Sequence, residues 1–152
     1  MDTHGGSGMD GYDVFQQIGH LLRRAYQRHL AIFQEAITDE TGVTSVQFVT
    51  LCALRDVGPC SQTALVRLTA IDQATIRGII ERLHARDLIG LSKDSQDARK
   101  VILSLTAKGE AIIRDIVPRA REVSQRTMGD LNAAEQLAIT VALKRMIGDL
   151  GG

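Results

Sequence analysis

The stretch Ser61–Arg86, SQTALVRLTAIDQATIRGIIERLHAR, decides the fold. It predicts a short helix over 62–68, a break at 69–71, and a longer helix that Asp72 opens and that ends near residue 86. In the longer helix, branched apolar side chains recur at helical spacing and face inward, whereas polar side chains are left to face out. A short helix, a tight turn and a longer helix with a polar outer face are typical of a helix-turn-helix.

Two short apolar runs follow this motif. Residues 88–91 (LIGL) and 101–105 (VILSL) predict strands, and the polar segment 93–99 between them predicts a turn. Together they form a hairpin with a polar tip, which beside a helix-turn-helix is a wing. The fold class is therefore mainly α with a small β-hairpin wing, a winged helix-turn-helix.

Helices are expected on both sides of this motif. Apolar residues at three- and four-residue steps predict a long helix from about Tyr12, which residues 39–43 end. Thr44 or Ser45 caps a further helix, and Thr106 and Asn132 cap the last two. We expect a flexible tail over 1–11 and a single domain over 12–150. Within that domain, 44–106 is the winged lobe, and 12–43 and 107–150 are dimerisation helices.

Composition excludes several classes of protein. The chain has 152 residues, 44 % of them hydrophobic, with no apolar run of the ~20 residues that span a membrane. No signal peptide is visible, so a cytoplasmic protein is expected. The four histidines show no metal spacing, and no nucleophile motif or phosphate-binding glycine loop is present. We therefore expect no enzyme activity, no metal and no cofactor.

The net charge is zero, with 18 basic and 18 acidic residues, so DNA binding would require positive charge concentrated locally. Polar side chains at the start of the longer helix (Gln73, Thr75 and Arg77) are candidates for base contacts, the alternative being an ordinary solvated helix face. Arg99 at the wing tip is a candidate for the minor groove, with Asp97 as its brace. The remaining candidates are phosphate contacts: Ser61, Gln62 and Thr63, for which helix capping is the alternative, and Lys93 and Lys100.

The residues from Thr44 to Gly109 resemble the MarR family (multiple antibiotic resistance regulator). Gln47-Phe48 and Gly58-Pro59 match its second helix and turn, and Asp72, Thr75 and Arg82-Leu83 match its recognition helix. The wing motif Asp-x-Arg, three residues, Leu-x-Leu-Thr is matched by Asp97, Arg99, Leu103, Leu105 and Thr106. Three positions depart from the family pattern, namely Gly78, Asp87 and Leu91.

The resemblance implies a homodimer whose outer helices interlock across a two-fold axis and present two recognition helices about 34 Å apart to a pseudo-palindromic operator. The sequence agrees, because the end helices carry apolar stripes that a lobe of this size cannot cover.

The family commonly represses transcription and releases DNA on binding a small phenol or aromatic acid. The segment Gln27–Phe33 resembles regulators of aromatic-acid catabolism. Arg23, Tyr26 and His29 offer a cation, a phenol and an imidazole for an aromatic carboxylate. A histidine on an apolar helix face is alternatively a satisfied core or interface residue.

Two further functions remain open at this point. A winged-helix module can bind protein rather than DNA, although such a module has no need of Arg99 or of a polar recognition helix. A thiol-based redox sensor would use Cys52 or Cys60. Nothing near either cysteine obviously lowers a thiol pKa, which favours reduced thiols.

Overall fold

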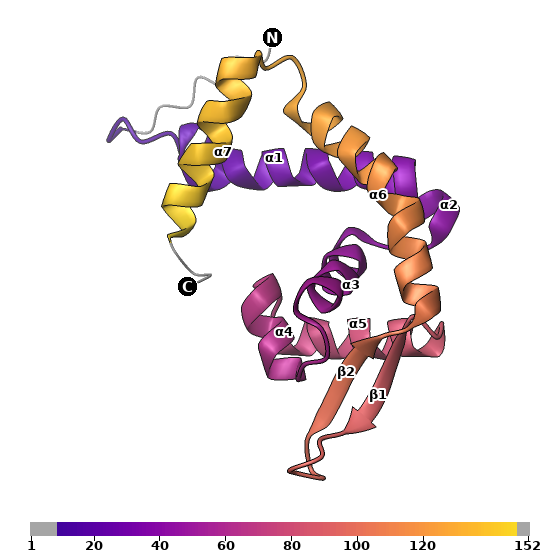
Figure 1. The fold of residues 1–152 in the computed structure, drawn as a ribbon. Coiled ribbons are helices and arrows are strands. Elements are labelled where there is room, and N and C mark those ends of the chain that lie inside the picture. Colours follow the sequence, from indigo (N-terminus) through magenta and orange to yellow (C-terminus); the bar gives the residue numbers. More distant parts are fainter. Residues whose placement is uncertain (1–8, 149–152) are drawn as a thin grey trace.

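The computed structural model describes residues 9–148 and shows a winged lobe below two long crossing helices (Figure 1). The lobe consists of α3 (Ser45–Val57), α4 (Gln62–Thr69), α5 (Gln73–Ala85), β1 (Ile89–Lys93) and β2 (Val101–Leu105). The flanking elements are η1 (Val14–Gln16), α1 (Ile18–Phe33), η2 (Gln34–Thr38), α2 (Asp39–Thr41), α6 (Ala107–Met128) and α7 (Ala133–Ile147). The expected mainly helical fold with a two-stranded wing is confirmed.

The expected start of the first helix is wrong. Asp13 caps a single 3-10 turn by accepting from the Phe15 N–H, and Gln17 is then extended, so α1 begins only at Ile18. The carboxyl end also differs from a plain helix, because the π-helical segment η2 joins α1 to α2 before Gly42 ends the run with φ +72°. The predicted tail over 1–11 lies largely outside the described residues.

Side-chain caps fix the helices of the lobe and the start of α6. Thr44, Ser61, Asp72 and Thr106 each accept a hydrogen bond from the backbone N–H three residues later. Thr44 forms a full capping box with Gln47, as Asn132 does with Glu135 at the start of α7. These caps satisfy N–H groups that a helix otherwise leaves unpaired, so local sequence alone sets where the helices begin.

The wing is an antiparallel pair in which Ile89 faces Leu105 and Lys93 faces Val101. The first strand is shifted from the predicted 88–91, because Leu88 is fully buried beneath it and pairing continues to Lys93. Cys60 forms a short bridge to β2, in which its N–H donates to the Leu103 carbonyl at 3.0 Å and its carbonyl accepts from the Leu103 N–H at 2.8 Å. The wing is thereby fixed to the start of the helix-turn-helix.

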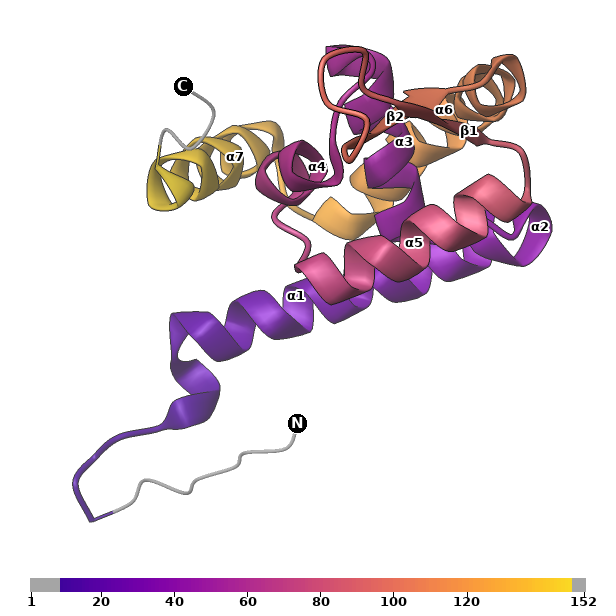
Figure 2. The ribbon, with the colours of Figure 1, turned by 90° about the horizontal axis from the view of Figure 1, so that it is seen from below.

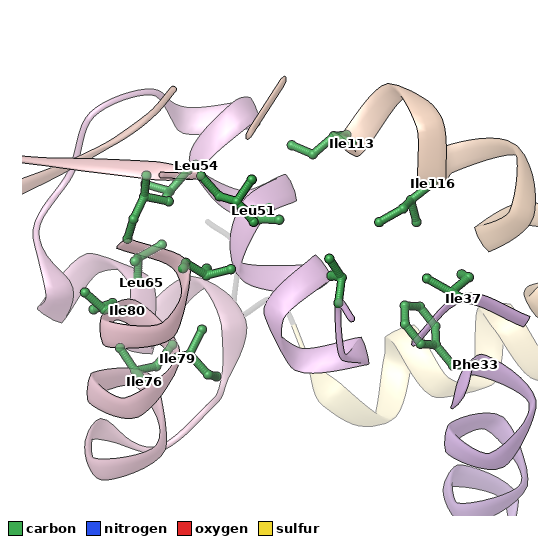
Figure 3. Packing of buried hydrophobic residues seen from close by; sticks show 14 of the residues in the cluster. Phe33, Ile37, Leu51, Leu54, Leu65, Ile76, Ile79, Ile80, Ile113 and Ile116 are labelled. Carbon is green, nitrogen blue, oxygen red and sulfur yellow. The ribbon is translucent and has the colours of Figure 1, made fainter. Parts of the chain in front are cut away.

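One apolar cluster joins the lobe to the upper helices (Figure 3). Leu51 and Leu54 of α3 pack towards the residues of α4 and α5. The same helix also faces Phe33 of α1, Ile37 of η2, and Ile113 and Ile116 of α6. Most of these side chains are less than 5 % exposed. The recognition helix therefore rests on the same core that anchors the carboxyl end of α1.

The amino-terminal half of α1 and all of α7 stand apart from this core. No residue of α7 is buried, and in Figure 2 both elements extend away from the lobe on one side. Their exposed side chains include large apolar ones: Ile18, Leu21, Leu22 and Tyr26 on α1, and Leu137, Ile139, Val141, Met146 and Ile147 on α7. In the part of the chain that the structure describes, no helix is long and apolar enough to cross a bilayer.

Candidate nucleic-acid interface

The start of α5 is held by Asp72. Its carboxylate accepts from the Thr75 N–H at 2.9 Å and from the Thr75 hydroxyl at 2.7 Å, and these bonds lower the pKa of Asp72. The hydroxyl hydrogen of Thr75 is thus directed at Asp72, which leaves its oxygen lone pairs for an incoming donor. Thr75 serves the helix cap as well as the exposed face.

The outer face of α5 carries the predicted base-contact residues. Gln73, Thr75 and Arg77 are exposed, whereas Ile76, Ile79, Ile80 and Leu83 are buried in the core. Gly78 faces open space, since no atom lies within 4 Å of where a Cβ would be. A helix of this kind offers a guanidinium and an amide to the major groove next to a position at which its backbone can approach closely.

The start of α4 contains the other predicted helix contacts. The Ser61 hydroxyl oxygen accepts from the Ala64 N–H at 3.2 Å, as the capping alternative expected. Gln62 is half-buried and Thr63 is exposed. Backbone N–H groups at this helix end and the Thr63 hydroxyl can bind a phosphate while Ser61 acts as the cap.

The wing tip carries an exposed cation that a neighbouring carboxylate braces. Asp97 accepts from the backbone N–H of Arg99 at 3.1 Å and from its Nε at 3.3 Å, while the Arg99 side chain is 93 % exposed. Lys93 is exposed at the end of β1, and Lys100 is exposed directly before β2. The pair orders the guanidinium without burying it, which is the arrangement a minor-groove contact needs.

Two exposed guanidiniums were missed by the sequence reasoning. Arg67 on α4 and Arg82 on α5 lie on the same lobe as the predicted contacts. Their helical positions opposite the buried Leu65 and Ile80 are visible in the sequence, so charge combined with helical spacing was the signal that could have found them.

The three candidate ligand residues follow one side of α1. The Tyr26 and His29 rings stack with centroids 6.1 Å apart, and His29 in turn lies 6.3 Å from Phe33, whose ring is 6.0 Å from Phe48 of α3. Arg23 and Tyr26 are exposed, and His29 is half-buried. A row of rings therefore leads from the exposed part of α1 into the shared core.

His29 has a defined partner. Its Nδ1 lies 3.0 Å from the Thr127 hydroxyl, which donates its hydrogen to the Val123 carbonyl at 2.7 Å. Thr127 can then only accept from His29, so Nδ1 carries the proton and Nε2 remains an acceptor. Burial lowers the pKa of His29 and keeps the ring neutral at pH 7. The alternative of a satisfied histidine thus holds for Nδ1, while Nε2 stays available.

A cavity of about 490 Å³ lies elsewhere, along α6 and the end of α3, and none of the three candidate ligand residues lines it. Its lining consists of Arg55, Glu110, Ile113, Arg114, Val117 and Pro118. The two cysteines are half-buried and burial raises the pKa of each thiol. Raised pKa values disfavour the thiolate that a redox sensor needs.

Comparison with known proteins agrees with this geometry. Residues 43–101 match the MarR family model. The chain is 58 % identical to the HTH-type transcriptional repressor NicR of Pseudomonas putida, over 90 % of this chain and 85 % of NicR. A solved structure concerning regulation of DNA binding of Bordetella bronchiseptica BpsR by 6-hydroxynicotinic acid superposes with a TM-score of 0.85 at 53 % identity, covering 90 % and 97 % of the two chains.

PcaV of Streptomyces coelicolor, solved in complex with its natural ligand, superposes with a TM-score of 0.81 at 29 % identity, covering 91 % of this chain and 96 % of PcaV. The match to NicR covers 90 % of this chain, so it includes the end helices as well as the winged lobe. The chain belongs to the MarR family of DNA-binding transcription regulators.

Proposed function

We propose that this protein is a homodimeric repressor that occupies a pseudo-palindromic operator and leaves it when an aromatic acid binds. The observation that carries DNA binding is the polar face of α5 beside the braced Arg99, both exposed on one lobe. The relatives support repression, since NicR is a transcriptional repressor.

A second copy of the chain is expected to cover the end helices. α7 exposes large apolar side chains on two faces, Leu137 and Val141 on one and Ile139 and Met146 on the other, and nothing in one subunit buries them. Exposed apolar side chains gathered in this way mark an interaction surface. Association through α1 and α7 would bury these faces and place two recognition helices on one side of the DNA.

The proposed effector is a small aromatic acid of the 6-hydroxynicotinate type, the compound that regulates DNA binding of BpsR. On α1, Arg23 would bind the carboxylate, Tyr26 would stack on the ring, and the Nε2 of His29 would accept from the ring N–H or hydroxyl. Arg23 and Tyr26 are exposed, so the partner subunit would complete the site.

Fluorescence anisotropy with DNA from upstream of the protein's own gene tests the operator contacts. Arg77→Ala should weaken specific binding by about 1–3 kcal/mol and relax base preference, because it removes a candidate base contact. Arg99→Ala should weaken binding and leave dimerisation intact. If both variants bind as tightly as the parent, these contacts are wrong.

Thermal shift and DNA release with 6-hydroxynicotinate test the effector site, with benzoate for comparison. Arg23→Ala should lose both responses and keep DNA binding. Arg24→Ala, an exposed arginine next to it on α1, is the matched control and should keep both responses. Equal behaviour of the two variants would contradict the assignment of Arg23.

A further inference from the structure

The recognition helix is tied directly to the segment that follows α1. Arg86, the residue that ends α5, donates from Nη2 to the Thr41 carbonyl at 3.0 Å, across 45 residues of sequence. The arginine is half-buried, so this bond is shielded from competing water. The contact joins the helix that reads DNA to α2 and not merely to its neighbour in sequence.

The turn after α2 leaves space for this guanidinium. Gly42 has φ +72°, and a Cβ at this position would lie 3.4 Å from Arg86 Nη1. A side chain here would be strained by the positive φ, while its Cβ would meet the guanidinium only at ordinary contact distance. Gly42 therefore allows the turn that presents the Thr41 carbonyl to Arg86.

α2 is also held from its other side. Arg119 of α6 binds the Glu40 carboxylate with both terminal nitrogens, at 2.6 and 3.3 Å. The start of α6 in turn bonds the end of α5, where Lys108 Nζ donates to the Arg86 carbonyl at 3.0 Å. α2 thus lies between the recognition helix and the long helix that joins the lobe to the end helices.

The π-helical segment η2 connects α2 to the candidate ligand residues. It begins five residues after His29, and its Ile37 is fully buried in the shared core. Such segments hold one extra residue per turn and recur at functional sites. A change from π to α pairing would move α2 along the helix axis by about 1.5 Å, the rise of one residue.

We propose that Arg86 is the positioning residue that couples effector binding at α1 to the orientation of the recognition helix, through the Thr41 carbonyl. Ligand contact at His29 displaces η2 and α2, and Arg86 carries that displacement to α5. This inference rests on the proposed effector response, and it assigns the route by which the response reaches DNA.

The test is the coupling factor, defined as the ratio of DNA dissociation constants with and without saturating 6-hydroxynicotinate. Because it is a ratio, a change in the DNA affinity of the ligand-free protein cancels. Coupling factors of about 5 to 150 are typical. In Arg86→Ala the coupling factor should fall by about tenfold, or to one where the parent's factor is smaller than ten. The affinity of the DNA-free protein for the ligand, measured by calorimetry, should not change. Arg86→Lys should recover part of it.

Gly42→Ala strains the turn that presents the Thr41 carbonyl to Arg86 and should lower the factor as well. Arg82→Ala, an exposed arginine one turn earlier on α5, is the matched control and should keep the parent's factor. A parental factor in both Arg86→Ala and Gly42→Ala would overturn the proposal.

Hydrogen exchange of the ligand-free protein separates this proposal from that of the effector. If the parent itself does not release DNA with 6-hydroxynicotinate, the effector assignment has failed and the link is judged by exchange alone. Arg86→Ala should then speed exchange of the Gly42 amide, which bonds the Thr38 carbonyl at 2.8 Å, together with amides at the end of α5. Acceleration confined to α5 would overturn the link.

Discussion

Two helices of similar length show how differently the two parts of this molecule are stabilised. α5 has 13 residues and buries four of them within its own subunit, whereas α7 has 15 residues and buries none. Leu137 of α7 is 67 % exposed. The winged lobe is thus stabilised by contacts within one chain, whereas the apolar faces of the end helices would be buried only in the proposed dimer. Within a single subunit the end helices are the incomplete part of the molecule.

The largest effect should come from a charge on the incomplete part. Leu137→Asp places a carboxylate in the surface that we expect the partner to cover, so dimerisation should be lost. DNA affinity should then fall by at least about 100-fold, because two linked half-site contacts become one. Light scattering and anisotropy measure both. Leu91→Asp, at an exposed leucine on the wing, should leave the dimer mass unchanged.

The complementary change acts on the folded lobe. At Gly109 a Cβ would lie 2.2 Å from the Leu88 carbonyl oxygen and 2.7 Å from Leu105, so Gly109→Ala must displace α6 from the wing. We expect a loss of about 1–3 kcal/mol in the free energy of unfolding, the usual cost of overpacking. Urea unfolding followed by circular dichroism checks this. An unchanged urea midpoint would contradict this prediction, because it would show that the lobe tolerates a larger distance between α6 and Leu88.

A smaller effect of opposite sign is expected on α5. Gly78 lies mid-helix with open space at its Cβ position, so Gly78→Ala should raise the free energy of unfolding by about 0.5–1 kcal/mol. If close approach to DNA needs the glycine, operator affinity should fall at the same time. A rise in both stability and affinity would show that this position does not contact DNA.

The smallest effect concerns pH and the junction of the two parts. The pKa of His29 is lowered below 6.5 in the folded protein, so the unfolded chain binds more protons between the two values. Its contribution to stability is therefore complete above about pH 6.5 and declines as pH falls towards the folded pKa. His29→Gln should remove this part of the pH dependence in thermal melts. If the melting temperatures of the parent and of His29→Gln depended on pH in the same way, this role of His29 would be wrong.

The features that the sequence predicted best are those that depend on residues close together in the chain. The caps at Thr44, Ser61, Asp72, Thr106 and Asn132 were predictable because each one satisfies a backbone group within three residues. The wing followed from alternation and a polar turn. The start of α1 was missed because the apolar spacing continues through residues whose backbone is not helical.

Contacts across the fold were not predictable. The bond of Arg86 to Thr41 spans 45 residues and that of His29 to Thr127 spans 98, and neither leaves a pattern in one sequence. The π-helical segment η2 continues the apolar spacing of α1, so nothing in the sequence set it apart from an ordinary α-helix. The positions of the DNA-contact candidates were therefore foreseeable, while the connections that would regulate them were not.

The bridge between Cys60 and Leu103 limits how this protein can adapt to DNA. It fixes the hairpin to the beginning of α4, and α4 packs on the recognition helix α5, so the wing and α5 should not swing independently. Each lobe should then meet the duplex as a rigid body. What can still vary is the tilt of each lobe relative to α1 and α6. The distance between the two operator half-sites that the protein binds best would measure that tilt.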